Sequence, residues 1–194
     1  MIGEEENLVS IASLSPKKQL AFALFVFERM LPSLAAFSKD TGFDDSCYLQ
    51  AKDAAWATLQ NGQVDRSLIE ACLRDAPDTE DYSYELTSYA LNAALAMNEI
   101  LEFTQDGCAD HITSVSTLAG DSLDLYLSTL EDSVVSSPEE DRQIASDPLI
   151  QEAHRREEAD IRFLVGLPEQ FTNETILSLR ARADTQAPLL PLAL

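Results

Sequence analysis

The chain has 194 residues, of which 45% are hydrophobic, and this length suits one compact domain better than two. Lys and Arg total 13 against 34 Asp and Glu, which gives a formal net charge of -21 at pH 7. A charge of this sign repels phosphate backbones and anionic lipids, so nucleic-acid binding and membrane binding are both disfavoured. We therefore expect a single domain over residues 1–194.

The N-terminal segment, the longest apolar run and the cysteines indicate the compartment. The segment "MIGEEENLVS" lacks the basic region of a secretory signal, and the run from Leu20 to Phe27 is far shorter than the roughly 20 residues that span a bilayer. Three cysteines without paired spacing, Cys47, Cys72 and Cys108, favour reduced, packed thiols over a disulfide framework. We expect a cytoplasmic protein.

Apolar residues recur at helical spacing along nearly the whole chain, and no stretch keeps the strand period for more than a few residues. Ser15-Pro16 is typical of a helix start, and Gly42 of the end of that helix. A second helix begins at Asp45 or Ser46. Asp65 can cap a short third helix that ends before Pro77.

The second half of the chain continues this pattern. Residues 89–101, "YALNAALAMNEIL", are apolar on most of the helical circumference, as in a helix surrounded by others. A long helix follows Gly107, and Ser137-Pro138 and Asp147-Pro148 start two more before a last helix over residues 173–183. The long helix carries a predicted apolar stripe of Ile112, Val115, Ala119, Leu123, Tyr126, Leu130 and Val134.

These elements predict an all-α, single-domain bundle of about seven or eight helices that share one core. The tail, residues 185–194, is apolar and holds Pro188 and Pro191, so we expect it to be extended where it packs. Its leucines must be covered, either by a groove of the same bundle or by a second copy of the chain. A homodimer is therefore one expected state.

Adjacent charges, Glu28 and Arg29, interrupt the most apolar helix of the chain. On a helix the two side chains point about 100° apart, so each needs partners of its own. Pro32 has no N–H, and its ring clashes with the carbonyl of Glu28, so the helix is predicted to kink or restart there. Two interpretations are open: the two charges form a polar clamp at the kink, with a structural role alone, or they line a small pocket for an anionic ligand.

The motifs "ERMLP", "FSKDTGFDD" and "AWATL" are similar to those of the YjaG-like family of uncharacterised bacterial proteins. The matching residues are Glu28, Arg29, Met30, Pro32, Phe37, Thr41, Gly42, Phe43, Asp45, Trp56 and Leu59. The resemblance implies an all-helical, single-domain, cytoplasmic bacterial protein with no established activity or catalytic residues. We take four of the matching residues as ligand or interface candidates: Glu28, Arg29, Asp45 and Trp56.

Metal and catalytic motifs are few. "CADH", from Cys108 to His111, has the spacing of two metal ligands, but the other histidine, His154, is far along the chain, and a helix junction explains the motif better. Four carboxylates share a stripe with Ser88 and Asn92, namely Glu85, Glu99, Glu102 and Asp106. A di-iron bundle also needs Glu-x-x-His, which does not occur, and no nucleophile or phosphate-binding motif is present. We predict no catalytic residue, cofactor or metal.

The middle of the chain is acidic, because no Lys or Arg occurs between Arg74 and Arg142 while sixteen Asp and Glu do. This segment is interpreted as a solvated face, as a docking surface for a basic protein partner, or as a mimic of nucleic acid. The sequence favours a non-catalytic acidic interaction or regulatory module. The alternative is a small-molecule-binding or enzymatic bundle with a pocket near Glu28 and Arg29.

Overall fold

The computed structural model describes residues 11–60, 62–131 and 146–192. Seven α-helices and no strand lie in these residues, which confirms the all-α prediction. The helices are α2 (Pro16–Thr41), α3 (Ser46–Thr58), α4 (Arg66–Arg74), α5 (Thr87–Asp106), α6 (Ala109–Glu131), α8 (Pro148–Val165) and α9 (Asn173–Asp184). The helix start predicted at Ser137-Pro138 lies outside the described residues.

The helix boundaries follow the chemistry of the flanking residues. α2 starts at Pro16 and ends at Gly42, whose φ of 76° is left-handed and therefore suits a residue without a Cβ. α5 ends in the same way at Gly107, with φ of 70°. The side chains of Asp65 and Asp147 each accept the amide hydrogen two residues ahead, at 2.8 and 2.7 Å, and so cap α4 and α8.

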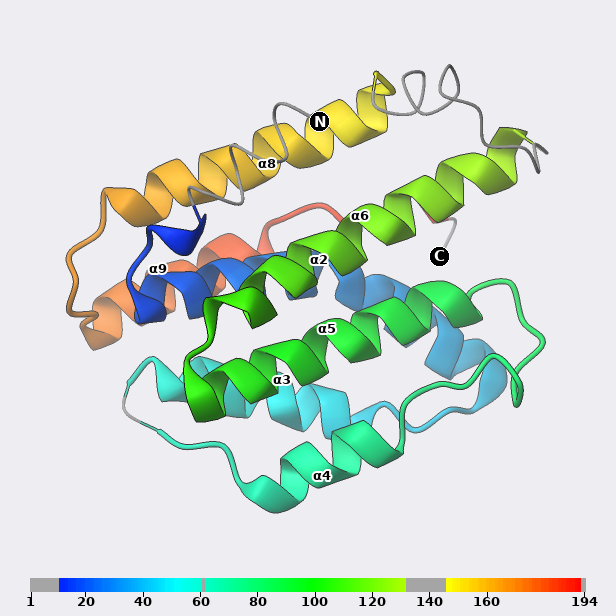
Figure 1. The fold of residues 1–194 in the computed structure, drawn as a ribbon, viewed down its shortest axis with the longest axis horizontal. Coiled ribbons are helices and arrows are strands. Elements are labelled where there is room, and N and C mark those ends of the chain that lie inside the picture. Colours follow the sequence, from blue (N-terminus) through cyan, green and yellow to red (C-terminus); the bar gives the residue numbers. More distant parts are fainter. Residues whose placement is uncertain (1–10, 61, 132–145, 193–194) are drawn as a thin grey trace.

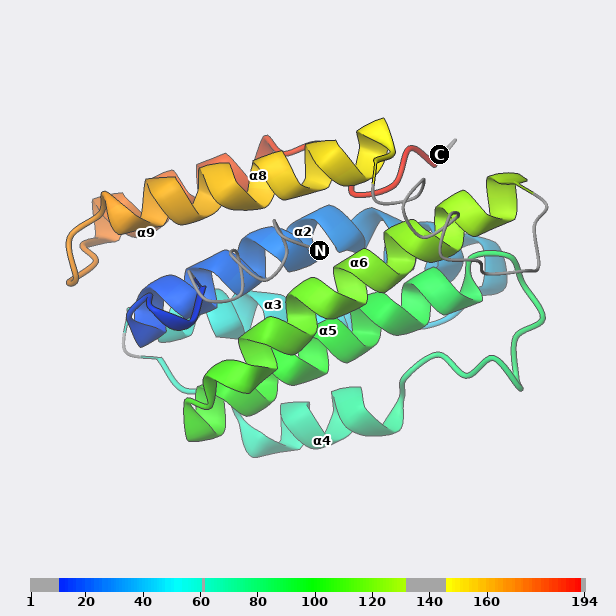
Figure 2. The ribbon, with the colours of Figure 1, turned by 45° about the horizontal axis from the view of Figure 1, so that its top comes forward.

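The bundle is built around α2 and α5. α2 contacts α3, α5, α6, α8 and α9, whereas α5 contacts α2, α3, α4 and α6. α8 and α9 cover one side of α2, and α4 lies on the opposite side of the bundle beside α3 and α5 (Figures 1 and 2). The buried apolar residues form one cluster, and residues 89–101 contribute heavily to it, as predicted.

α2 has the length and hydropathy of a membrane span, yet 78% of its most apolar window is buried inside the fold. Its four phenylalanines pack in the centre of the core together with large side chains of α3. The largest fully buried side chains of these two helices are Phe22, Phe25, Phe27, Phe37, Tyr48 and Trp56. A central core helix passes the same hydropathy test as a membrane span.

Two local predictions were wrong in part. Of the two outcomes predicted at Pro32, a restart does not occur, because α2 continues as one helix to Thr41, and a kink stays a prediction. On α6 the predicted stripe fails at Leu130, which is 64% exposed, whereas Leu127 is buried. The cause is the length of α5. Tyr89, only two residues after α5 begins, already contacts Thr129 near the end of α6. Little of α5 is therefore left to cover the last turn of α6. Val134 lies outside the described residues.

Candidate functional site

Glu28 lies on the side of α2 that meets α3. Its carboxylate accepts a hydrogen bond from the indole Nε1–H of Trp56 at 3.2 Å and another from the ammonium of Lys52 at 3.4 Å. The Glu28 side chain is 11% exposed and Trp56 only 2%, so an unpaired carboxylate or indole N–H would be costly here. The structure therefore brings together two predicted site residues, Glu28 and Trp56, and gives both a structural partner.

Arg29 points instead toward α8 and α9. Its Nη1 donates to Asp160 Oδ2 at 2.6 Å, and both side chains are almost fully buried. The second oxygen of Asp160 accepts from Arg182 at 2.7 and 2.9 Å and from the amide of Gln186 at 3.2 Å. One carboxylate thus holds two guanidinium groups and joins α2, α8, α9 and the tail. We call Arg29, Asp160, Arg182 and Gln186 the arginine cluster.

The tail completes this side of the bundle. The N–H of Leu189 donates to the carbonyl of Arg29 at 2.8 Å. The preceding carbonyl, that of Glu28, receives no helical hydrogen bond from Pro32, because proline has no N–H. Leu189 and Leu190 are buried against the same chain, 7% and 2% exposed. The described part of the tail, up to residue 192, therefore packs on its own bundle, as in the first of the two arrangements that the sequence predicts.

Sequence reasoning missed three members of the arginine cluster, Asp160, Arg182 and Gln186. A signal was present for Asp160, because it lies four residues before Leu164 and next to Ile161 on the buried stripe of α8. A carboxylate at such a position is rarely buried without a partner. No comparable signal marks the other two, since Arg182 lies in the last turn of α9 and Gln186 follows that helix, and both are only half-buried.

Asp45, the fourth predicted site residue, stands apart from these groups. It occupies the N-cap position of α3, but its side chain makes no capping bond. The neighbouring Asp44 accepts the N–H of Ser46 instead, at 3.0 Å. Trp56 lies eleven residues later, roughly 16 Å along the helix axis at 1.5 Å per residue. Asp45 therefore belongs to the start of α3 and not to the Glu28 contact.

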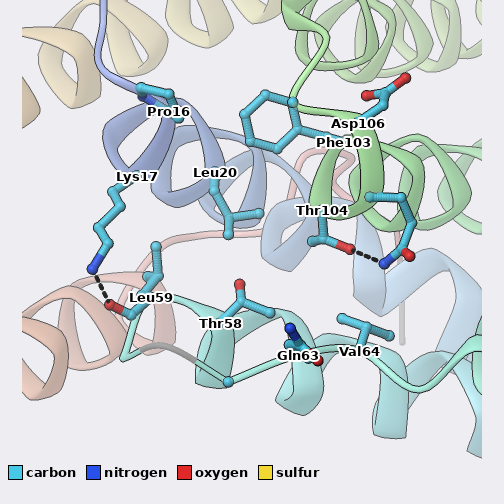
Figure 3. Close-up of a pocket in the computed structure, with 13 residues that line it drawn as sticks. Pro16, Lys17, Leu20, Thr58, Leu59, Gln63, Val64, Phe103, Thr104 and Asp106 are labelled. Atoms are coloured by element: carbon cyan, nitrogen blue, oxygen red, sulfur yellow. Dashed lines mark hydrogen bonds between the residues drawn. The ribbon is translucent and has the colours of Figure 1, made fainter.

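A pocket of about 640 Å³ opens at the end of the bundle where α2 begins and α5 ends (Figure 3). Its walls are the first turn of α2, the loop between α3 and α4, and the last turn of α5. Leu20, Leu59, Val64 and Phe103 are among the apolar lining residues. At one wall, Lys17 donates to the carbonyl of Leu59 at 3.1 Å. Neither Glu28 nor Arg29 is among the lining residues, so the pocket is separate from both.

The "CADH" motif forms the junction of α5 and α6. His111 Nδ1 lies 2.6 Å from Glu99, its Nε2 lies 3.2 Å from Asp106, and the N–H of Cys108 binds the other oxygen of Asp106. Burial alone would lower the pKa of His111, but hydrogen bonding and attraction to the two carboxylates raise it above its ordinary value. Among the residues that the structure describes, no group of three or more His, Cys, Asp or Glu side chains is arranged so that it could hold a metal ion.

Two of the three free cysteines, Cys47 of α3 and Cys72 of α4, lie close enough to influence the pKa of each other. The hydroxyl of Tyr48 donates to the carbonyl of Cys72 at 2.8 Å. Burial raises the pKa of Cys47 and raises that of Cys72 to about 12. Both thiols are therefore protonated near neutral pH and weakly nucleophilic.

Comparisons with known proteins place this fold. A family model described as "Protein of unknown function (DUF416)" matches residues 7–187. The chain is also similar to the crystal structure of a DUF416 family protein from Shewanella baltica, with a TM-score of 0.86 and 18% identity over 96% of this chain and 98% of that chain. At this identity the likeness concerns the fold alone. A comparison with curated proteins found no match. The chain therefore belongs to the DUF416 family of proteins of unknown function.

Proposed function

We propose that this protein is a non-catalytic interaction module of the bacterial cytoplasm that binds a basic partner through an acidic surface. The observation that supports it is the segment between α4 and α5, residues 75–85, which we call the acidic segment. All of its carboxylates are exposed, namely Asp75, Asp78, Glu80, Asp81 and Glu85. The acidic segment lies at the end of the bundle where α2 ends, since Tyr84 donates to Asp40 at 2.6 Å (Figure 1).

The chemistry of this end suits Lys and Arg side chains. Arg74, the base that precedes the acidic segment, is already paired with Asp75 at 2.9 Å. It therefore does not neutralise the other carboxylates of the acidic segment. Tyr84 is 40% exposed among them and offers an aromatic face to a cation. Carboxylates beside an exposed ring attract a basic chain over a distance and hold it at contact.

The test uses a labelled peptide of ten lysines, whose binding is followed by fluorescence anisotropy at low and at moderate salt. One variant replaces the five carboxylates of the acidic segment by Asn or Gln. A control variant makes the same change in charge at five exposed carboxylates elsewhere: Asp53, Glu70, Glu158, Glu174 and Asp184. We expect the first variant to weaken binding about tenfold and the control about twofold or less.

Equal weakening by the two variants would show that only the overall charge attracts the peptide, which contradicts a docking surface at the acidic segment. Absence of binding by the parent protein would favour a purely solvated face. Preference for a nucleic-acid-binding protein over the lysine peptide, at equal charge, would favour mimicry of nucleic acid instead.

Within the DUF416 family, we infer that the chain is YjaG-like. The support is that three of the matching residues, Glu28, Arg29 and Trp56, join α2 to its neighbours in the fold. The cytoplasmic location is supported by the three free cysteines, since the raised pKa values of Cys47 and Cys72 keep both of these thiols protonated.

A homodimer stays a prediction. Leu189 and Leu190 are already buried in their own bundle, so a dimer would need another apolar face. Light scattering on the full chain at micromolar concentration tests this, and a monomeric mass would contradict it. The alternative function, a ligand or substrate site near Glu28 and Arg29, requires a ligand that displaces Trp56, Lys52 or Asp160 from these charges.

A further inference from the structure

The pocket at the start of α2 differs in charge from the rest of this acidic protein. Within the described ranges, every Lys and Arg except Lys17 and Lys39 has a carboxylate oxygen within 4.0 Å. Lys39 is exposed near the end of α2, whereas Lys17 is half-buried and lines the pocket. The pocket wall therefore carries a positive charge, that of Lys17, which no carboxylate of the described residues neutralises.

Lys17 is held at the pocket wall by one neutral partner. Its ammonium donates to the Leu59 carbonyl, which orients the group but leaves its full positive charge (Figure 3). The first turn of α2 adds the partial positive charge of a helix N-terminus at the same wall. Both contributions favour a negatively charged ligand.

Asp106, the one acidic lining residue, does not cancel this charge. Its carboxylate accepts a hydrogen bond from the N–H of Cys108 at 2.7 Å and lies 3.2 Å from His111 Nε2. Both partners belong to the α5–α6 junction and not to the Lys17 wall of the pocket. Figure 3 shows this carboxylate pointing away from Lys17 and from the middle of the pocket. An anion beside Lys17 would meet no facing carboxylate among the lining residues.

The rest of the lining suits an apolar body with a few polar contacts. The lining includes the apolar side chains of Leu20 and Phe103 and the amide side chain of Gln63 (Figure 3), together with Gln105, whose amide donates to Thr104 at 3.2 Å. The volume of about 640 Å³ falls within the range of about 300 to 1,000 Å³ that small ligands occupy. We propose that this pocket binds a small organic anion, with its charged group at Lys17 and its apolar body against Leu20 and Phe103. This site is independent of the acidic segment, which lies at the other end of α2 (Figure 1).

Two fluorescent probes with similar aromatic bodies test the proposal on the full chain. The first is anionic, 8-anilinonaphthalene-1-sulfonate, and the second is neutral, N-phenyl-1-naphthylamine. Lys17→Met removes the charge but keeps an unbranched side chain, and Lys17→Arg restores it. Lys39→Met is the matched control, because it removes the same charge from an exposed position of the same helix. Circular dichroism and thermal unfolding of each variant check that it is folded.

We expect Lys17→Met to weaken binding of the anionic probe about fivefold or more while the neutral probe changes less than about twofold. Lys17→Arg should restore the anionic probe, and Lys39→Met should change neither. Gln63→Trp, at an exposed lining position, should weaken both probes because its ring fills the pocket. Octanoate should displace the anionic probe at lower concentration than octanol does.

Three results would overturn the proposal. The first is equal weakening by Lys17→Met and Lys39→Met, which would mean that the probe senses only the net charge. The second is unchanged binding in Gln63→Trp, which would place the probe elsewhere even if a Lys17 variant failed to fold. The third is failure of the parent protein to bind either probe at millimolar concentration.

Discussion

Glu28 and Arg29 are neighbours in the chain, yet they meet opposite conditions on the two sides of α2. Arg29 and Asp160 approach to 2.6 Å with 3% and 1% of their side chains exposed, whereas Glu28 and Lys52 lie 3.4 Å apart with 11% and 20% exposed. The two side chains point about 100° apart around α2, and this places the Arg29–Asp160 pair away from water while the Glu28–Lys52 pair stays partly exposed. Breaking a buried pair costs far more than breaking an exposed one, so the two sides should differ in their contribution to stability.

The largest effect is expected from Arg29→Ala. The change leaves Asp160 buried with only part of its partners and removes one of the groups that hold the tail, so it should lower the free energy of unfolding by about 2 to 4 kcal/mol. Urea unfolding measures this, with Lys39→Ala as an exposed control on the same helix. A midpoint equal to that of the parent would refute the structural role of the arginine cluster.

The other side of α2 should be less sensitive. Glu28→Gln keeps an acceptor for the indole of Trp56 but loses the charge that attracts Lys52, so we expect a loss of about 1 kcal/mol. Lys52→Met should cost less than this, because its side chain is partly exposed. If Glu28→Gln destabilised as strongly as Arg29→Ala, the contrast between the two sides would be wrong.

The sequence predicted the helices well because their signals are local. Ser15-Pro16, Gly42 and Gly107 act through backbone geometry within a few residues, and they marked the boundaries of α2 and the approximate start of α6 correctly. The partners of Arg29 were not predictable in the same way, since several acidic helices could supply a carboxylate. Choosing Asp160 requires knowing how α8 packs on α2. The pocket depends likewise on three segments that are distant in the chain.

Salt should distinguish the two pairs further. Double-mutant cycles for Glu28 with Lys52 and for Arg29 with Asp160 isolate the coupling energy of each pair. Raising the salt from about 0.02 to 0.5 M should reduce the Glu28–Lys52 coupling, because that pair is partly exposed, and should leave the buried coupling nearly unchanged. Equal sensitivity to salt would show that water reaches both pairs.

The smallest effect is expected at a third, more exposed pairing, that of His111 with Glu99, whose side chains are 25% and 33% exposed. Because the pKa of His111 is raised above 6.5 in the folded state, its protonated form stabilises the fold. This stabilisation is complete below about pH 6.5 and is lost as the pH rises through the raised pKa. The parent should therefore lose part of its Tm advantage over His111→Gln between pH 6 and pH 8.5. A constant difference in Tm would contradict this assignment.

The position of Asp160 in the chain has a consequence for synthesis of the protein. Arg29 is made 131 residues before the carboxylate that neutralises it, and Gln186 and Leu189 follow later still. At about 5 to 20 residues per second, a ribosome needs roughly 7 to 26 s to cover that distance. During this time α2 cannot bury its guanidinium favourably, so the nascent central helix must keep one face hydrated or shielded by a chaperone until α8 emerges.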